Sequence, residues 1–415
     1  SLRSPTLPTG KEASRGQGRV GPWREATEAA NCRVPSPSTR RVTLASITTM
    51  VAAIAPIHLF GALAPEIQDE LNFGDTAQGM AVAAFFALSA VLTSWGGSYT
   101  DRAGPTRALR TAVIASFLGA FAVMSAPSYG IIVVGLLIAA IGNAISQPGN
   151  SSFINLGVPT HRRGLAMGIK QSAIPVSTGF AGLALPAIAI TAGWRWAYVY
   201  ALVVAVAGFI LVPRLPPPQT THTAPRIHRP SSPLLIITLG ATASGIAVAP
   251  IGAFLVRSLE NSGFDPARAG IIQLCGSVLL ISTRVGWGRL MDGSDIDRFR
   301  FAAGILLLGS TGYPLLAFGS KPLMVVGALI VYGAAWSWAG VVHLGVVEHH
   351  SEATGGATGV LQAGMFIGAM IGPALFGIIA DSQGFATGWM ISFTAAIAAA
   401  TLFLRGAATL SRHLN

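Results

Sequence analysis

Two positively charged side chains stand inside long apolar runs of this sequence, where a charge is costly. Lys170 and Arg284 each lie about six residues from one end of such a run, which is ~9 Å at the rise of a helix. A charge at the centre of a membrane helix costs about 2.5–3.5 kcal/mol, so such a residue is a functional candidate by default. No Asp or Glu falls deep inside any apolar run. A bound anion would therefore be the natural partner of the Lys170 ammonium.

Each of the two cations also has a purely structural interpretation. Lys170 could extend to the polar interface and leave only its aliphatic stem in the apolar layer, and both interpretations of this lysine stay open. Arg284 stands one turn before Gly288, so its position favours a role at the helix end or at the interface over substrate binding.

Uncharged polar residues also occur inside the apolar runs. His58 and His343 fit hydrogen-bonded packing residues, although a histidine in a membrane can relay protons. Asn143 and Gln147 lie one helical turn apart on one face, which fits either a polar cavity wall or hydrogen bonding between helices. The candidate binding residues are Lys170, Gln171, Gln362, His58, Asn143, Gln147 and Arg284.

The composition places these residues in a membrane protein. Of 415 residues 52% are apolar and 10% are charged, against roughly 25% charged in soluble domains. Twelve apolar runs are long enough to cross a bilayer as helices. They lie near residues 43–64, 76–97, 107–126, 129–150, 164–190, 194–213, 234–256, 268–290, 301–318, 322–347, 355–380 and 387–404. The fold class is therefore an all-α polytopic membrane protein with twelve transmembrane helices.

The sequence repeats itself with one offset of 191 residues. The polar hinge that begins at Gly97 returns at Gly288, and Gln171 is matched by Gln362 whereas Lys170 faces Leu361. A gap-free offset of this length indicates a doubled unit of about 190 residues, that is, two pseudo-symmetric six-helix bundles. We expect a disordered cytoplasmic arm at 1–40, bundles at 41–214 and 233–405, a cytoplasmic linker at 215–232 and a cytoplasmic tail at 406–415.

The distribution of Lys and Arg predicts the orientation, because cytoplasmic loops are enriched in them. Without the arm, the segments on the N-terminal side of the membrane contain Arg102, Arg107, Arg110, Arg162, Arg163, Arg214, Arg226, Arg229, Arg289, Arg298, Arg300, Arg405 and Arg412. The other side contains only Arg195, Arg257, Arg268 and Lys321. Both termini are therefore expected in the cytoplasm of a cell whose plasma (inner) membrane holds the protein.

The first hinge resembles the cytoplasmic signature between helices 2 and 3 of the major facilitator superfamily, with Gly97, Asp101, Arg102 and Gly104 at the family's positions. The resemblance covers residues 41–405. It implies that the glycine lets helix 2 press on helix 11, while the aspartate caps a helix and pairs with the arginine in the outward-facing state. A carboxylate beside a positive helix end is favourable on physical grounds as well.

The hinge departs from the family pattern in one respect, because Pro105 and Thr106 precede Arg107 where basic residues usually follow directly. The second hinge repeats the glycine and the aspartate as Gly288 and Asp292. The gating residues that the resemblance implies are Gly97, Asp101, Arg102, Gly104, Arg107, Gly288 and Asp292.

These observations predict a secondary active transporter for a small, anionic solute. In its general features the sequence resembles the cyanate- and nitroimidazole-type bacterial members of the family. The main alternative is a proton-coupled multidrug antiporter, but Ile138 stands where that branch has an arginine, and the cavity offers no acid. A membrane sensor is a more distant alternative. No catalytic pair or metal-ligand spacing occurs, so we expect no enzyme, cofactor or metal. Expected partners are the substrate, the lipid bilayer and, as an open question, protons; we expect a monomer and no nucleic acid.

Overall fold

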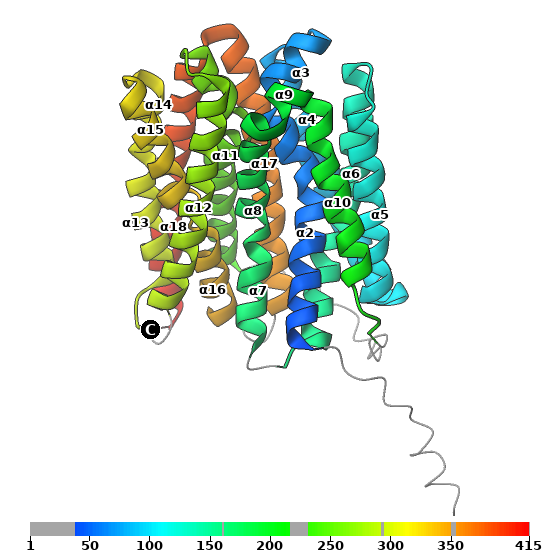
Figure 1. Cartoon of the computed structure of the whole chain (residues 1–415). Coiled ribbons are helices and arrows are strands. Elements are labelled where there is room, and N and C mark those ends of the chain that lie inside the picture. The colour runs from blue at the N-terminus through cyan, green and yellow to red at the C-terminus, as the bar shows by residue number, and fades with distance from the viewer. Residues whose placement is uncertain (1–37, 160–161, 216–230, 292–293, 350–353, 415) are drawn as a thin grey trace, which may run out of the picture. The chain divides into compact units, whose positions relative to one another are not determined.

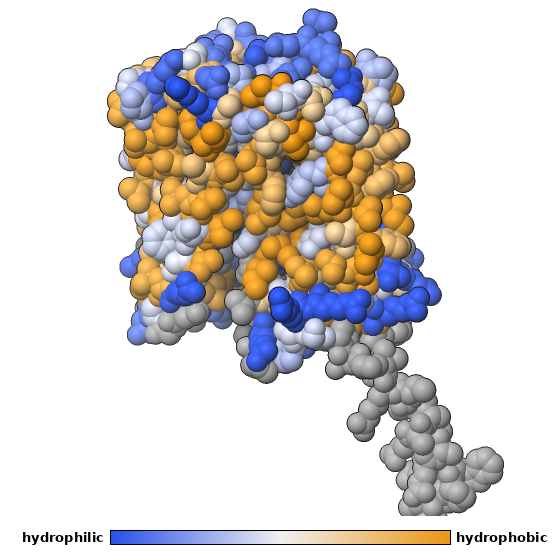
Figure 2. Space-filling model, viewed as in Figure 1, coloured by the Kyte–Doolittle hydropathy of each residue, from blue (hydrophilic) through white to orange (hydrophobic). Residues whose placement is uncertain are grey.

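The computed structural model describes residues 38–159, 162–215, 231–291, 294–349 and 354–414, and these ranges are helical throughout most of their length (Figure 1). Twelve helices in the described ranges are long and apolar enough to cross a membrane. Figure 2 shows an apolar band across the visible face of the molecule, between two hydrophilic ends. The chain is therefore a multi-pass membrane protein, as its composition predicts. The expected arm, apart from residues 38–40, and most of the expected linker lie outside the described residues.

Two sets of helices follow one another along the chain. The first bundle consists of α2 (Thr39–Ala62), α3 (Ala64–Leu71), α4 (Asp75–Ala103), α5 (Pro105–Met124), α6 (Tyr129–Gly157), α7 (Arg163–Gln171), α8 (Ala173–Ala184), η2 (Leu185–Ala189), α9 (Ile190–Ala192) and α10 (Trp194–Leu211). The second bundle consists of α11 (Ser232–Asn261), α12 (Pro266–Met291), α13 (Arg298–Ser310), α14 (Gly312–Phe318), α15 (Lys321–Ile330), η3 (Val331–Ala335), α16 (Ala339–His349), α17 (Thr354–Gln383) and α18 (Phe385–Leu414). The last helix thus extends through nearly all of the expected tail.

The helix boundaries repeat with the offset found in the sequence. The helices α4 and α12 start at Asp75 and Pro266, α7 and α17 at Arg163 and Thr354, and α10 and α18 at Trp194 and Phe385, each pair 191 residues apart.

The turns repeat with the same offset. Asn72 and Gly263 both adopt positive φ, at 54° and 79°, and so do Gly193 and Gly384, at 94° and 86°. Left-handed backbone strongly favours Gly and, to a lesser extent, Asn. The two halves therefore share their turns as well as their helices.

The two bundles meet tightly at the end of the molecule that carries α3, which we call the α3 end. A Cβ on Gly61 of α2 would lie 2.8 Å from the carbonyl oxygen of Gly252 in α11. A Cβ on Gly182 of α8 would lie 2.6 Å from the carbonyl oxygen of Gly270 in α12. Only glycine allows helices to approach this closely. One apolar cluster also joins the bundles at this end, since it contains both Phe60 and Phe254.

The bundles separate at the opposite end, which carries α7 (the α7 end). Here the apolar core is divided into one cluster around Phe153 in the first bundle and another around Phe299 in the second. Among the described residues, a Cβ on Gly288 would meet no atom within 4 Å, and one on Gly97 would meet only Pro148 of its own bundle. The structure is therefore closed at the α3 end and parted at the α7 end. We call the boundary between the bundles the seam.

Candidate functional site

The two intramembrane cations both lie beside breaks in helices at the seam. The helix α7 ends at Gln171 and α8 begins at Ala173. Pro175 has no N–H, so the carbonyl oxygen of Gln171 lacks the donor that a continuous helix would supply four residues later. On the other side of the seam, η3 interrupts the helix before Trp336. Such interruptions leave backbone carbonyls available to side chains.

Arg284 of α12 bridges these two breaks. Its Nη1 donates to the carbonyl oxygen of Gln171 at 3.1 Å, and its Nη2 donates to that of Trp336 at 3.2 Å. The first bond crosses from the second bundle to the first. Its buried Nε has no hydrogen-bond partner among the residues that the structure describes. The guanidinium therefore contacts two carbonyl oxygens and no carboxylate in the described part of the chain.

Lys170 is buried rather than extended to the surface, with an exposed fraction of 6%. Its ammonium donates to the carbonyl oxygen of Gln147 at 3.3 Å and to the hydroxyl of Ser151 at 3.1 Å, both in α6. An ammonium has three donors, and these two bonds use two of them. No carboxylate among the described residues forms an ion pair with it.

His343 of α16 lies within the electrostatic reach of both cations, Lys170 from the first bundle and Arg284 from the second. Its Nδ1 is 2.9 Å from the carbonyl oxygen of Ala339. The two bundles thus bring two cations and an imidazole ring to the same part of the seam, on the side of the α7 end. Chemically, this arrangement offers charged and neutral hydrogen-bond donors to an anion.

The two symmetry-related glutamines are half-buried, and the structure leaves their amide groups available. Gln171 contributes its carbonyl oxygen to Arg284, but neither its amide nor that of Gln362 has a hydrogen-bond partner among the described residues. Gln147 likewise contributes its carbonyl oxygen to Lys170 while its side chain is half-buried. Within the described part of the chain, none of these three side-chain amides forms a hydrogen bond.

Two of the expected binding residues lie apart from this group. Asn143 is fully buried and donates to the hydroxyl of Ser89 in α4 at 3.1 Å, inside the first bundle. The structure thus matches interhelical hydrogen bonding at Asn143 and not a cavity wall. His58 is buried with its Nδ1 unpartnered. In α2, His58 comes eight residues after Met50, which contacts Ser146 of α6. At the helical rise, His58 therefore lies about 12 Å further toward the α3 end than Met50.

Sequence reasoning missed a second set of contacts across the seam. The hydroxyls of Thr178 in α8 and Ser277 in α12 are 2.9 Å apart, and the amide of Gln273 donates to the carbonyl oxygen of Thr178 at 3.0 Å. All three are buried. The sequence feature that could have indicated these contacts is the presence of hydroxyl and amide groups inside apolar runs, because such groups often join membrane helices.

The gating residues of the first hinge are parted from the second bundle. Gly104 joins α4 to α5 with a φ of 80°, which requires glycine in practice. Asp101 and Arg102 are exposed, and Arg102 donates to the carbonyl oxygen of Ser98 at 3.0 Å instead of pairing with Asp101. Arg107 is also exposed. Asp101 and Arg102 form no ion pair with each other in this structure, in which the bundles are separated at this end.

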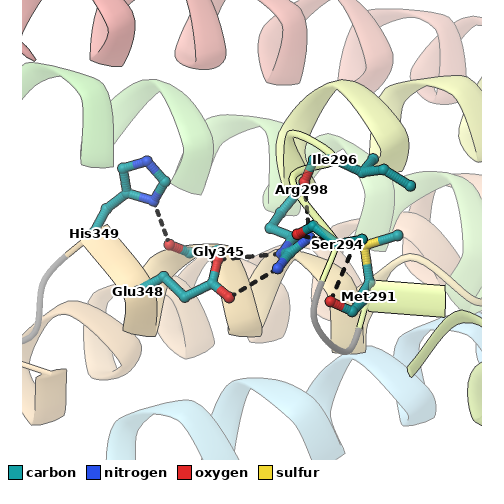
Figure 3. Close-up of polar contacts among 7 residues, drawn as sticks. All are labelled: Met291, Ser294, Ile296, Arg298, Gly345, Glu348 and His349. Carbon is teal, nitrogen blue, oxygen red and sulfur yellow. Dashed lines mark hydrogen bonds and ion pairs between the residues drawn. The ribbon is translucent and has the colours of Figure 1, made fainter. Parts of the chain in front are cut away.

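The second hinge is held within its own bundle by Arg298 (Figure 3). Its guanidinium donates two hydrogen bonds, in a bidentate arrangement, to the carboxylate of Glu348 at the end of α16, at 3.1 and 3.2 Å. It also donates to the carbonyl oxygens of Ser294 and Ile296, at 3.2 and 2.8 Å. Arg298 lies 191 residues after Arg107, so the two hinges place an arginine at the same point of the repeat. Asp292 lies outside the described residues.

Known proteins resemble this chain in sequence and in fold. It is 25% identical over 341 residues to an uncharacterised MFS-type transporter of Mycobacterium tuberculosis, which covers 76% of this chain and 75% of the relative. It is also 25% identical to the hexuronate transporter of Bacillus subtilis, over 41% of each chain.

Two solved structures have the same fold. The inward-facing, occupied structure of a bacterial homologue of the human lysosomal transporter Spinster matches with a TM-score of 0.67 at 16% identity, over 89% of this chain and 96% of the other. The D-xylose–proton symporter matches with a TM-score of 0.69 at 15% identity, over 88% and 96%. The family model of the Major Facilitator Superfamily matches residues 44–360. The chain, with its twelve helices in two repeated bundles, belongs to the Major Facilitator Superfamily and is a membrane transporter rather than an enzyme.

Proposed function

We propose that this transporter moves a small organic or inorganic anion by alternating access. The observation that carries the proposal is the pair of cations at the seam. Lys170 comes from the first bundle and Arg284 from the second, and neither has a carboxylate partner among the described residues. A buried charge is costly unless an opposite charge compensates it. An anion between them would compensate both and would contact both bundles.

Contact with both bundles matters for the mechanism. A ligand shifts a conformational equilibrium only if it interacts differently with the two states. An anion between the bundles would contact one cation of each. It would lose one of these two contacts when the bundles separate at this place. The neighbouring glutamine amides, which form no hydrogen bond to other described residues, would complete its hydrogen bonding. The proposed site therefore consists of Lys170, Gln171, Arg284 and Gln362, with Gln147 at its edge.

One sequence relative is named for a solute that carries a negative charge. A hexuronate is a sugar with a carboxylate group, and the hexuronate transporter is one relative of this chain. The overall look of the sequence favours cyanate-type anions as well. The chemistry common to both is a single compact negative charge, which two convergent cations would recognise.

We also propose that the α7 end faces the cytoplasm. Outside the N-terminal arm, Lys and Arg are concentrated in the segments at this end, which is the usual bias of cytoplasmic loops. With this orientation the structure is an inward-facing state, closed toward the outside.

Transport by the purified protein in liposomes would test the proposed substrate class. Radiolabelled cyanate, glucuronate and nitrate are compared with cationic dyes, each with and without a pH gradient. We expect saturable uptake of at least one anion and no movement of the dyes. A proton-driven multidrug antiporter would instead move the dyes only when the gradient is present, and this result without anion uptake would contradict the proposal.

A further inference from the structure

The N-terminus of α4 has no cap of its own. Its N-cap residue is Gly74, which has no side chain to accept a hydrogen bond. The first N–H groups of a helix lack intrahelical partners and are usually capped by the side chain of a Ser, Thr, Asp or Asn at this position. Asp75, the first helical residue, is engaged elsewhere, because its carboxylate accepts a bond from Gln68 at 2.9 Å and lies 3.5 Å from the Nε of Arg257.

The missing cap comes from the other bundle. The carboxylate of Asp381, near the end of α17, accepts hydrogen bonds from the backbone N–H of Asp75 at 3.0 Å and of Thr76 at 2.6 Å. The residues are more than 300 positions apart in the chain. The two unpaired backbone N–H groups and the positive end of the helix dipole both favour a carboxylate at this place.

The surrounding contacts hold the same two helices together. A Cβ on Gly79 of α4 would lie 2.2 Å from the carbonyl oxygen of Pro373 in α17, and one on Gly377 would lie 2.3 Å from that of Asp75. The amide of Gln78 donates to the carbonyl oxygen of Ala253 in α11 at 2.5 Å. Opening the α3 end would therefore remove the cap from α4 and leave its first N–H groups without a protein acceptor.

We propose that Asp381 is a positioning residue of the transport cycle, which holds the α3 end closed by capping α4 across the seam. The same pair of helices then has a latch at each end, because the hinge at Gly97 and Asp101 lies at the opposite end of α4. In this structure the Asp381 contact is formed and the hinge is parted, so we expect the two latches to form in opposite states of the cycle.

The test measures the opening of the α3 end directly. Cys32 and Cys275 are replaced by serine, and spin labels are attached at Ser125→Cys and Ser320→Cys, two exposed positions at the α3 end of the first and the second bundle. The full-length protein is studied in lipid nanodiscs without substrate. The distance distribution gives the ratio of open to closed molecules.

The Asp381→Asn variant removes the charge and keeps the shape. We expect it to raise the ratio of open to closed molecules at least about tenfold, which corresponds to about 1.4 kcal/mol. Asp297→Asn is the matched control, because Asp297 caps α13 by accepting from the N–H groups of Phe299 and Arg300 within one bundle. This control should leave the distance distribution unchanged.

A second variant perturbs the same contact from the opposite side. A Cβ on Gly74 would lie 3.1 Å from the Oδ2 of Asp381, so Gly74→Ala should push the carboxylate back by a few tenths of an ångström. Its backbone is extended, with a φ of −93°, and therefore accepts alanine without strain. We expect the open fraction to rise here too. The proposal would be overturned if Asp381→Asn gave the same distance distribution as the control Asp297→Asn. If Asp381→Asn does not fold, the same comparison is made with Gly74→Ala.

Discussion

Arg284 of α12 donates a hydrogen bond across the seam to the carbonyl oxygen of Gln171 in α7, at 3.1 Å. That oxygen is available because Pro175 cannot supply the fourth-residue donor of a regular helix. An interrupted helix in one bundle is thus completed by a cation of the other. This link lies between the closed α3 end and the parted α7 end, where alternating access would require the contacts between the bundles to change.

Arg284→Gln should impair anion uptake strongly. The substitution removes the charge and the two-pronged contact with two carbonyl oxygens, and we expect uptake to fall at least about tenfold, since bonds to charged groups contribute about 1.5–3 kcal/mol. Arg284→Lys should rescue it only in part, because an ammonium cannot reproduce the planar fork. Initial uptake rates in liposomes give the measurement. Arg268→Gln, at an exposed arginine, is the control, and equal rates in the two glutamine variants would remove Arg284 from the site.

Asp101→Asn should slow transport without disturbing the state described here. In this state Asp101 is exposed and has no ion pair among the described residues, so its loss costs nothing. The carboxylate is expected to matter in the opposite state, where a favourable helix-end charge contributes about 0.3–1 kcal/mol. We therefore expect transport about two- to fivefold slower at unchanged protein abundance. Wild-type rates in this variant would exclude the first hinge from gating.

Glu66 of α3 should make the stability of the protein depend on pH. Burial, opposed by a backbone hydrogen bond and reinforced by the charge of Asp69, raises the pKa of Glu66 to about 7. Because this lies above the value of about 4.3 for an unfolded chain, the folded protein binds the proton more tightly. The resulting stability is complete below the unfolded pKa and is lost as the pH rises through about 7.

Melting temperatures at pH 5 and pH 8 test this prediction. We expect the wild type to melt at least about 2 °C lower at pH 8, and Glu66→Gln to reduce the difference. The other charges around Glu66 are those of Asp69 and of Glu260 in α11. Asp69→Asn, at an exposed carboxylate of the same helix, serves as the comparison. An equal pH effect in wild type and Glu66→Gln would mean that another group is responsible.

The sequence was sufficient to predict the twelve helices and their repetition. Apolar length decides which segments cross a membrane, because every backbone group in the bilayer must be bonded within a helix. The offset of 191 residues also places the turns correctly, as the pairs Asn72 with Gly263 and Gly193 with Gly384 show. These features depend on local patterns, which a sequence displays directly.

The partners of the polar residues could not be predicted in the same way. Arg284 and Asp381 bond to backbone groups, which every residue possesses, so no pattern of side-chain types marks the contact. Asn143 fits a helix face that could line a cavity, but the rotation of α6 directs it to Ser89 inside the bundle. Rotation of a membrane helix follows from packing against its neighbours, and a single sequence does not specify it.

The most direct test of the anion hypothesis is the Lys170→Gln variant, measured by uptake of the best anion from the liposome panel and by its ligand-induced thermal shift. Lys321→Gln, at the exposed lysine beside Gly263, is the matched control. If Lys170 binds the anion, its substitution should lower the apparent affinity for the anion at least about tenfold, both in uptake and in the thermal-shift titration. The melting temperature without ligand should change by no more than about 2 °C. Uptake and thermal shift equal to those of Lys321→Gln would contradict the account.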